Sequence, residues 1–591
     1  MSSVLTDVQK KQIEQVEELL FTGPEKEGFV KDLFFGKFRA ESIMPFPELP
    51  EVNHLRGSEM VDKVKVFCRD HIDPVDIDVN GRIPESVVTG LGDLGVLGMT
   101  IQPEYGGQGY SQTNYCRVME IIGGHCASTG VFVNAHHSIG LRALELFGTD
   151  EQKKEWMLPL ASGDKMAAFA LTEPMAGSDA ANVRTRAVPT EDGKGYTITG
   201  EKRWITNGGI ADVITLMART PDVSNPDGKI TAFLVTPDMP GFQVLESRME
   251  KCGIRGTATG RMEFQEMYVP KDNVLGPVGQ GLKVALTVLD FGRTTFGACC
   301  TGAAKFCLER MVYRANQRRQ FTKTLGEFQL VQDKIAHAAA DIFAMESATY
   351  HTASLIDSGA EDFMVETAML KVFASDQLWR ITNDCLQIWG GKGFFTDQPF
   401  ERMMRDARLN QIGEGANDVL RCFIAAVGLR HVGRDMEAIS RNPLTAYKLL
   451  RTRPDVPIKH EHMRFHSRNL GKQVAKFAWA VEMAIVRYRE SVIDQQYIQA
   501  RLADIATELY LSSCVYSRLS SLLVNGTIPE PDKQRDLKTG MLYLRQAHIR
   551  NRRRLEDLKT NLDDESIAVA AEWLDEDFQD DWVLKGDLAE I

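Results

Sequence analysis

The sequence predicts a mainly α-helical protein with a central β-domain, and three observations support this fold class. The chain has 591 residues, which exceeds the length that one hydrophobic core usually supports. Apolar residues recur with helical spacing before residue 169 and again after residue 277. Between these points, short alternating runs are typical of strands. We therefore expect a helical N-terminal domain, a small β-barrel-like domain, a four-helix bundle and an extra C-terminal helical domain.

The first 168 residues divide into two parts. Residues 1–50 are expected to form a loosely attached N-terminal arm, because Pro24 and a cluster between Pro45 and Pro50 interrupt helices. From 51 to 168 the apolar residues follow a helical period, broken by glycine-rich loops. This second stretch is predicted to be a helical N-terminal domain.

The β-domain is expected over residues 169–277. Its strand-like runs alternate or are rich in β-branched residues, as in Gly195–Gly200, Val213–Met217 and Thr231–Val235. A helical bundle is expected over 278–432, because proline and glycine are rare there until Gly390.

The C-terminal part contains a basic connector and a further helical domain. The connector, residues 433–472, carries an excess of Lys and Arg between 441 and 472. A solvated loop and attachment to an anionic membrane surface explain this excess equally well. From 473 to 591, apolar residues that fall on one helical face predict the extra domain: Leu502, Ile505, Leu509, Tyr516, Leu519 and Leu523.

Charge and composition exclude several classes of protein. The formal net charge of -12 argues against a general nucleic-acid binder, because the phosphate backbone would repel the chain. No apolar run approaches the length of a membrane span. The first twenty residues contain four acidic side chains, unlike a mitochondrial transit peptide, and lack the apolar core of a secretory signal. Either a precursor segment is missing or the protein stays where it is made.

Cysteines and histidines do not indicate a metal site. The ten cysteines are scattered without a CxxC pair, which suits a reducing compartment and predicts neither disulfides nor zinc. The clustered histidines lack a partner group of Cys or carboxylates at ligand spacing, so we interpret them as structural or surface residues: His136, His137, His460, His462 and His466.

Four separated segments carry residue types that fit a cofactor site. Phe169–Asp179 offers hydroxyls and accessible backbone N–H groups, which suit a polar ring and a phosphate-bearing ligand. Lys202–Gly209 places an indole and a hydroxyl two residues apart, and Gln317–Phe321 pairs a cation with an aromatic ring. The fourth segment runs from Gln387–Gly391 to Arg408–Asp418. Each alone is unspecific, but the four in this order are not.

Together these segments resemble the acyl-CoA dehydrogenase family. The resemblance covers about 51–432 in order, and runs such as Gln499–Asp504 extend it to the very-long-chain branch, which includes a relative that serves as a complex I assembly factor. It implies a fold in which a helical domain, a β-domain and a four-helix bundle hold FAD between them.

The resemblance also implies a role for particular residues. Phe169, Leu171, Thr172, Trp204 and Thr206 would surround the flavin ring, and Gly177 and Ser178 would lie where flavin phosphate and substrate approach. The adenosine-diphosphate end of a neighbouring subunit's flavin would contact Arg318, Phe321, Gln329, Gln387, Gly390 and Gly391. Ala416, Asn417 and Asp418 would also contact the cofactor, and the substrate would contact Ser178, Asp290, Arg293 and Gly415.

Glu414 matches the family's catalytic base. The α-proton of a thioester is weakly acidic, so a carboxylate must accept it while the oxidised flavin accepts a hydride from the β-carbon. Some relatives place the base at the position of Gly292, where glycine cannot act.

Three residues depart from the family pattern. Gly413 stands where an aromatic residue is common, and Ala416 replaces a threonine. Asn134, near the base of the family's acyl cavity, replaces a small residue of the very-long-chain branch. The resemblance therefore leaves activity level and acyl chain length open.

The resemblance implies a flavin-dependent fatty acyl-CoA dehydrogenase of β-oxidation, on the matrix side of the mitochondrial inner membrane. The resemblance implies a homodimer that passes electrons to electron-transfer flavoprotein. Two alternatives stay open, an acyl-CoA oxidase and a weakly active or inactive assembly scaffold. The chain ends Leu-Ala-Glu-Ile591 rather than in a peroxisomal Ser-Lys-Leu signal, which counts against the oxidase.

Overall fold

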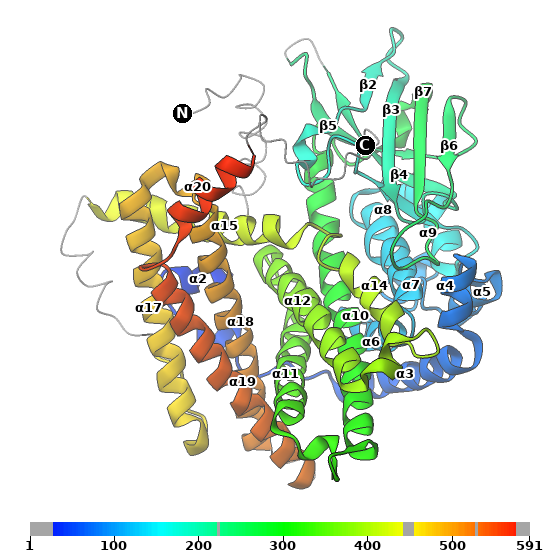
Figure 1. Cartoon of the computed structure of the whole chain (residues 1–591). Helices are drawn as coiled ribbons and strands as arrows, with labels where there is room; N and C mark the ends of the chain where they lie inside the picture. The colour runs from blue at the N-terminus through cyan, green and yellow to red at the C-terminus, as the bar shows by residue number, and fades with distance from the viewer. Residues whose placement is uncertain (1–27, 222–224, 441–453, 526–529, 575–591) are drawn as a thin grey trace.

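A computed structural model describes residues 28–221, 225–440, 454–525 and 530–574, and it confirms the predicted fold class (Figure 1). A helical N-terminal domain and a β-domain lie on one side of a long helical bundle, and further C-terminal helices lie on the other side. No helix of the described residues is long and apolar enough to cross a membrane.

The N-terminal domain is helical, and its helix α6 and π-helix η3 are mostly buried. Its elements are α3 (Glu51–His71), α4 (Pro74–Asn80), α5 (Glu85–Asp93), α6 (Gln112–His125), α7 (Ala127–Val133), the π-helix η3 (Asn134–Leu141), α8 (Arg142–Phe147) and α9 (Asp150–Ser162). His136 and His137 lie wholly buried in η3. His136 contacts the carbonyl of Leu160 and accepts from the amide of Ala167, both at 3.0 Å, so this histidine is structural as predicted. His137 Nδ1 lies 3.0 Å from another backbone carbonyl, that of Leu97.

The β-domain is one eight-stranded sheet. Its strands are β1 (Ala167–Ala170), β2 (Arg186–Pro189), β3 (Gly195–Ile205), β4 (Val213–Thr220), β5 (Lys229–Val235), β6 (Phe242–Glu246), β7 (Gly260–Pro270) and β8 (Val274–Leu275). Their order is β6-β7-β3-β2-β4-β5-β8, and β1 pairs in parallel with β4. Most neighbours are antiparallel.

Three long helices without proline form the bundle, as the sequence predicts. A fourth helix follows the loop that carries Glu414. They are α10 (Gly281–Gln317), α11 (Gln329–Asp357), α12 (Met364–Trp389) and α15 (Asn417–Ser440), with the short α13 (Gly391–Phe394) and α14 (Phe400–Leu409) before α15. Helix α10 packs on both α12 and α6, and a Cβ at Gly302 would lie 1.8 Å from the carbonyl oxygen of Glu120. Only glycine permits this close approach of α10 and α6.

The C-terminal domain adds α17 (Arg464–Tyr488), α18 (Gln496–Asn525), α19 (Glu530–Asp557) and α20 (Asp563–Trp573). The apolar face predicted from the sequence is buried, with Leu502, Leu509 and Leu519 fully shielded from solvent. This face of α18 packs on α11 and α15, so the extra domain shares one hydrophobic core with the bundle.

The prediction of a loosely attached N-terminal arm is wrong for the part of the arm that begins at residue 28. Helix α2 (Phe29–Phe34) is buried between the bundle and the C-terminal domain. The rings of Phe34 and Phe477 lie 4.9 Å apart, and the amide of Val30 donates to Glu366 at 3.2 Å. A six-residue helix shows little periodicity, so the prolines on either side were a stronger signal than the four apolar residues within α2.

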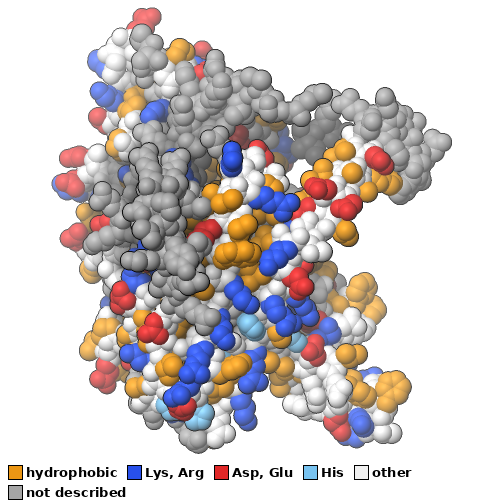
Figure 2. Space-filling view, turned by 90° about the vertical axis from the view of Figure 1, so that its left-hand side faces the viewer, with side chains coloured by type: hydrophobic (Ala, Val, Ile, Leu, Met, Phe, Trp, Pro, Cys, Tyr) orange, Lys and Arg blue, Asp and Glu red, His pale blue; other side chains and the backbone are white. Residues whose placement is uncertain are grey.

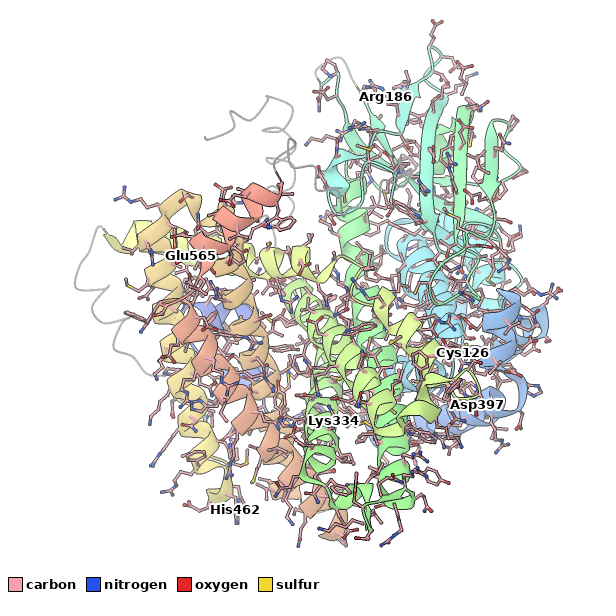
Figure 3. All side chains as sticks on the ribbon, viewed as in Figure 1. Cys126, Arg186, Lys334, Asp397, His462 and Glu565 are labelled. Carbon is pink, nitrogen blue, oxygen red and sulfur yellow. The ribbon has the colours of Figure 1, made fainter. Side chains whose placement is uncertain are left out.

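The basic connector is only partly described. Residues 441–453 lie outside the described residues, and 464–472 form the first turns of α17 rather than a connector. In the space-filling view, Lys, Arg and hydrophobic side chains alternate over the C-terminal domain (Figure 2). Figure 3 labels His462 in the C-terminal domain and Cys126 in the N-terminal domain, on opposite sides of the bundle. The described residues contain no group of three or more His, Cys, Asp or Glu that could hold a metal ion.

Candidate active site

Glu414 lies in the loop between α14 and α15, and two cations hold this loop. Glu414 has φ 60° and Gly415 has φ 95°, so the loop turns through the left-handed region at both residues. Arg293 Nε of α10 donates to the carbonyl of Glu414 at 3.1 Å. Lys371 Nζ of α12 donates to the carbonyl of Gly415 at 2.6 Å. A left-handed glutamate costs conformational energy, and such strain is often found at functional sites.

The side chain of Glu414 is partly buried, and one of its two carboxylate oxygens is shielded from solvent. Its Oε2 atom is buried and has no hydrogen-bond partner among the described residues. Asn134 Nδ2 lies 3.3 Å from the other oxygen, Oε1. Burial raises the pKa of Glu414 to about 7, although nearby Arg293 and Lys371 lower it. A carboxylate with a pKa near neutrality is suited to accept a proton at physiological pH.

Gly292 faces the same carboxylate. A Cβ at this position would lie 3.0 Å from Glu414 Oε2. The two base positions that the resemblance implies therefore converge on one point of the structure, although they are distant in the sequence. With glycine at 292, Glu414 alone of the two supplies a carboxylate.

Asp290 and Arg293 form a buried pair beside the base. Arg293 Nη1 lies 3.1 Å from Asp290 Oδ1, and the hydroxyl of Thr367 donates to the same oxygen at 3.0 Å. Burial raises the pKa of Asp290 to about 6, against the opposing effect of Arg293. The pair orients the guanidinium that holds the carbonyl of Glu414. Thr367 and Lys371 could not be assigned a role from the sequence, because neither belongs to a distinctive motif.

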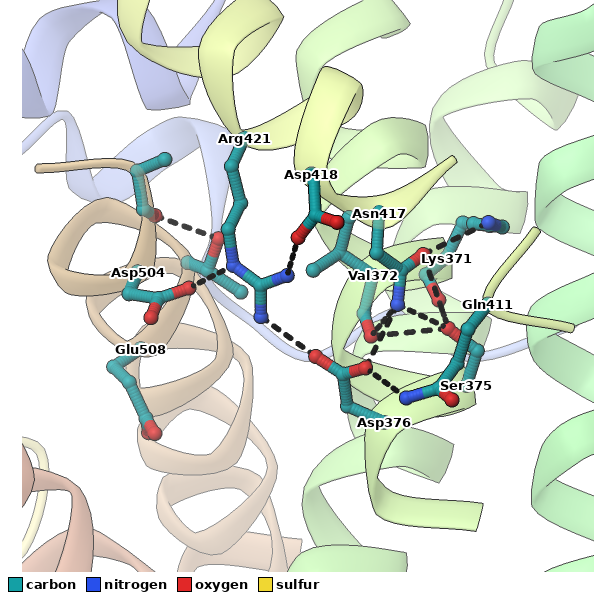
Figure 4. A network of polar contacts seen from close by, with 12 residues as sticks. Lys371, Val372, Ser375, Asp376, Gln411, Asn417, Asp418, Arg421, Asp504 and Glu508 are labelled. Atoms are coloured by element: carbon teal, nitrogen blue, oxygen red, sulfur yellow. Dashed lines mark hydrogen bonds and ion pairs between the residues drawn. The ribbon is translucent and has the colours of Figure 1, made fainter. Parts of the chain in front are cut away.

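A polar network extends from the base loop to the C-terminal domain (Figure 4). Asn417 accepts from Lys371 Nζ at 2.8 Å and donates to Asp376 at 2.8 Å. Arg421 bridges Asp376 at 2.6 Å and Asp504 of α18 at 2.8 Å. Asn417 is buried within this network, so it supports the loop. Asp418 is exposed, and its contact with a cofactor stays a prediction, as does that of Asn417.

Two of the predicted flavin-ring segments lie together. The amide of Arg203 donates to the carbonyl of Thr172 at 3.0 Å. Lys202 Nζ, fully buried, lies 2.7 Å from Glu173 and 2.8 Å from the carbonyl of Leu171. Burial lowers the pKa of Lys202 to about 8, although Glu173 raises it. This buried pair holds the 171–178 loop against β3, and its two residues were assigned no role from the sequence.

The residues expected around the flavin ring leave open surface. Trp204 has φ 60° and is 47% exposed, while Phe169 and Leu171 are partly buried against the core of the domain. Thr206 follows the end of β3 in a turn rather than on the strand. Gly177 and Ser178 are exposed, and a Cβ at Gly177 would meet nothing within 4 Å. An exposed indole beside open backbone fits a flat polar ring and a phosphate.

The residues expected at the adenosine-diphosphate end form a second, separate group. All six are exposed at the far end of the bundle, where α10 ends and α11 begins: Arg318, Phe321, Gln329, Gln387, Gly390 and Gly391. Phe321 is 86% exposed, and a Cβ at Gly390 or Gly391 would meet nothing within 4 Å. At about 1.5 Å per residue, the end of α10 lies roughly 35 Å from Arg293. These six residues therefore lie far along the bundle from Arg293 and the loop of Glu414.

Four family models match the chain. They are the acyl-CoA dehydrogenase N-terminal domain over residues 57–164, the middle domain over 168–267 and the C-terminal domain over 279–429. The ACAD9/ACADV C-terminal domain matches residues 461–574.

Curated relatives match over most of the chain. The human very long-chain specific acyl-CoA dehydrogenase, mitochondrial, is 35% identical, over 85% of this chain and 80% of its own length. A probable acyl-CoA dehydrogenase, FadE10, of Mycobacterium tuberculosis is 32% identical, over 95% of this chain and 90% of its own length.

Solved structures show the same fold. An acyl-CoA dehydrogenase from Bacillus anthracis in complex with FAD aligns with a TM-score of 0.79 at 26% identity, over 91% of this chain and 94% of its own. Butyryl-CoA dehydrogenase from Megasphaera elsdenii aligns with a TM-score of 0.61 at 33% identity, over 64% of this chain and 98% of its own. The chain therefore belongs to the acyl-CoA dehydrogenase family, the FAD-dependent oxidoreductases that act on CH–CH bonds, and it carries the ACAD9/ACADV C-terminal domain.

Proposed function

We propose that the protein converts fatty acyl-CoA thioesters to trans-2-enoyl-CoA in β-oxidation, with Glu414 as the base. The buried carboxylate of Glu414 carries this proposal. Its pKa lies near 7, its backbone is strained, and Arg293 and Lys371 hold its loop from two bundle helices. A surface turn would need none of these features.

The chain's own residues perform the binding and the proton transfer. Asp290 and Arg293 orient the base loop, and Ser178 and Gly415 are proposed to contact the thioester. Glu414 accepts the α-proton, and its burial excludes water that would compete for the base. FAD, when bound, accepts the hydride from the β-carbon. The backbone N–H of Glu414 donates to the thioester oxygen as negative charge develops there, as in relatives of this family.

A homodimer is part of the proposal, because each chain presents its two flavin-contact groups far apart. We infer that Phe321 and the exposed glycines at the end of one bundle contact the adenosine-diphosphate end of the partner's FAD. By resemblance, the electrons pass to electron-transfer flavoprotein. The mitochondrial relatives support a mitochondrial location, and a bacterial relative matches a longer stretch, 95% of this chain against 85%.

The inner membrane is the proposed site of attachment, through residues 441–472 and the rest of helix α17, whose first turns are residues 464–472. Helix α17 presents a mixed basic and apolar face to solvent: Phe465, Arg468, Lys472, Lys476, Trp479, Met483 and Val486. Their spacing of three and four residues places them on one side of the helix, as in helices that bind anionic membranes.

Two alternatives remain distinguishable by the electron acceptor and by turnover. An oxidase would reduce oxygen at a rate comparable to its rate with a dye, and a scaffold would bind FAD without turnover. The deciding experiment is a screen of acyl-CoA thioesters of graded length, run anaerobically with a dye acceptor and again with oxygen as the acceptor. We expect turnover with long chains; the absence of turnover with every chain length would support the scaffold.

A further inference from the structure

Asn134 contacts Glu414 directly, although the two residues are 280 positions apart in the sequence. It is the first residue of the π-helix η3, and its side chain is 1% exposed. Its Nδ2 lies 3.3 Å from Glu414 Oε1. Arg293 and Lys371 bond to carbonyl oxygens of the base loop, so among the described residues Asn134 is the side chain that donates to the carboxylate itself.

The position of Asn134 is well defined. Farther along η3, His136 is fixed between the carbonyl of Leu160 and the amide of Ala167. Both ring nitrogens of His136 are thus engaged, and burial lowers its pKa to about 4, so the ring stays neutral. Irregular π-helical turns of this kind are often found at functional sites.

Packing alone does not account for an asparagine at this point. The Oδ1 atom of Asn134 is buried and has no hydrogen-bond partner among the described residues. An unpaired buried acceptor destabilises a folded protein, and an apolar residue of similar size would avoid this cost. The bond to Glu414 is the contact that requires an amide.

We propose that Asn134 is a positioning residue, whose amide holds the ionised carboxylate of Glu414 for proton abstraction. This proposal rests on the proposed role of Glu414. A donor to a carboxylate favours its charged form. The charged groups near the base are Arg293 and Asp290 on α10 and Lys371 on α12, and none of them bonds to Oε1. Without the Asn134 amide, Glu414 would stay protonated to a higher pH.

The first test is the pH profile of kcat/KM for Asn134→Leu, which keeps the approximate size of the side chain and removes the donor. We expect the acid limb to move up by about one pH unit, with roughly tenfold lower kcat/KM at acid pH and a small difference at alkaline pH. Asn134→Asp, the isosteric variant, should move the limb farther, because it adds a like charge. Ser128→Ala on α7 is the control, since Ser128 accepts from the amide of Gly256 and does not contact the base. An equal loss of kcat/KM at every pH would overturn the proposal.

A second test needs no turnover. The stability difference between Glu414→Gln and wild type reports the ionisation of Glu414. Since burial raises the pKa of this carboxyl from 4.5 to about 7, the Gln variant should gain relative stability between these pH values and reach a plateau above 7. In the Asn134→Leu background, the plateau should begin about one pH unit higher. An unchanged onset would refute the role of Asn134, whereas failure of turnover alone would refute only the proposed dehydrogenation.

Discussion

At the scale of single residues, the site combines a strained, buried acid with two cations that bind its backbone. Arg293 and Lys371 are directed to carbonyl oxygens of the base loop, so they fix the loop without forming an ion pair with the carboxylate. A direct ion pair would lower the pKa of Glu414 and weaken it as a base. The arrangement instead leaves the pKa of Glu414 at about 7.

The pH dependence of turnover follows from this environment. The pKa of Glu414 is raised to about 7 by burial, and the base acts in its ionised form. We expect kcat/KM to rise with pH through about 7 and to level off above it, since kcat/KM reports the free enzyme. Stopped-flow measurements between pH 5.5 and 8.5 test this expectation. An acid limb centred near 4.5, the ordinary value, would show that the carboxylate is solvated in solution.

At the scale of secondary-structure elements, α2 joins the bundle to the C-terminal domain. Lys31 lies 2.5 Å from Asp362, and Phe34 is fully buried against α17. Burial raises the pKa of Glu366, which accepts from the amide of Val30, to about 7. The short helix is thus held by packing and by charged groups.

Phe34→Ala should destabilise the protein by about 3–5 kcal/mol, because it removes a fully buried ring. The loss should appear as earlier unfolding of the C-terminal helices in chemical denaturation, with FAD content retained under native conditions. Phe465→Ala, on the exposed face of α17, is the matched control and should leave stability nearly unchanged. Equal effects of the two substitutions would show that α2 does not join the two parts.

Much of the fold was predictable from local patterns, but contacts between distant segments were not. Long stretches without proline predict helices α10 to α12, and β-branched residues predict strands β4 and β5. Asn134 and Glu414 are 280 residues apart, and nothing in either local pattern predicts that they touch. The roles of Lys371 and of the Lys202–Glu173 pair were missed for the same reason, because a lone charged residue in a sequence is most often on the surface.

At the scale of the whole molecule, the proposed homodimer shares each flavin between the two chains. Phe321→Ala removes an exposed ring, so it should leave the stability of the monomer unchanged. It should lower FAD occupancy and shift the dimer towards monomer at low protein concentration. Absorbance of the flavin and analytical ultracentrifugation measure the two effects. Val79→Ala, a change of another exposed apolar side chain on α4, is the control; retention of FAD by Phe321→Ala would contradict the shared site.

The proposed membrane attachment also concerns the whole chain, because the basic face of α17 lies on the C-terminal domain, away from Glu414. Co-sedimentation with liposomes should depend on anionic lipid and weaken with salt, at roughly 1 kcal/mol per well-placed cation. Reversing charge in Lys472→Glu with Lys476→Glu should reduce binding, while turnover in solution stays unaltered. Binding that ignores lipid charge would exclude this surface.

Glu414 is proposed to accept the α-proton of the substrate. Anaerobic bleaching of the flavin after mixing with saturating acyl-CoA measures this step. Glu414→Gln keeps the size of the side chain but cannot accept a proton, and the flavin contacts come mainly from other segments. We predict that the variant retains FAD and binds acyl-CoA, while the rate of bleaching falls by roughly 10²–10⁴. A Gln variant that bleaches at nearly the wild-type rate would contradict the account and reassign the base to another carboxylate.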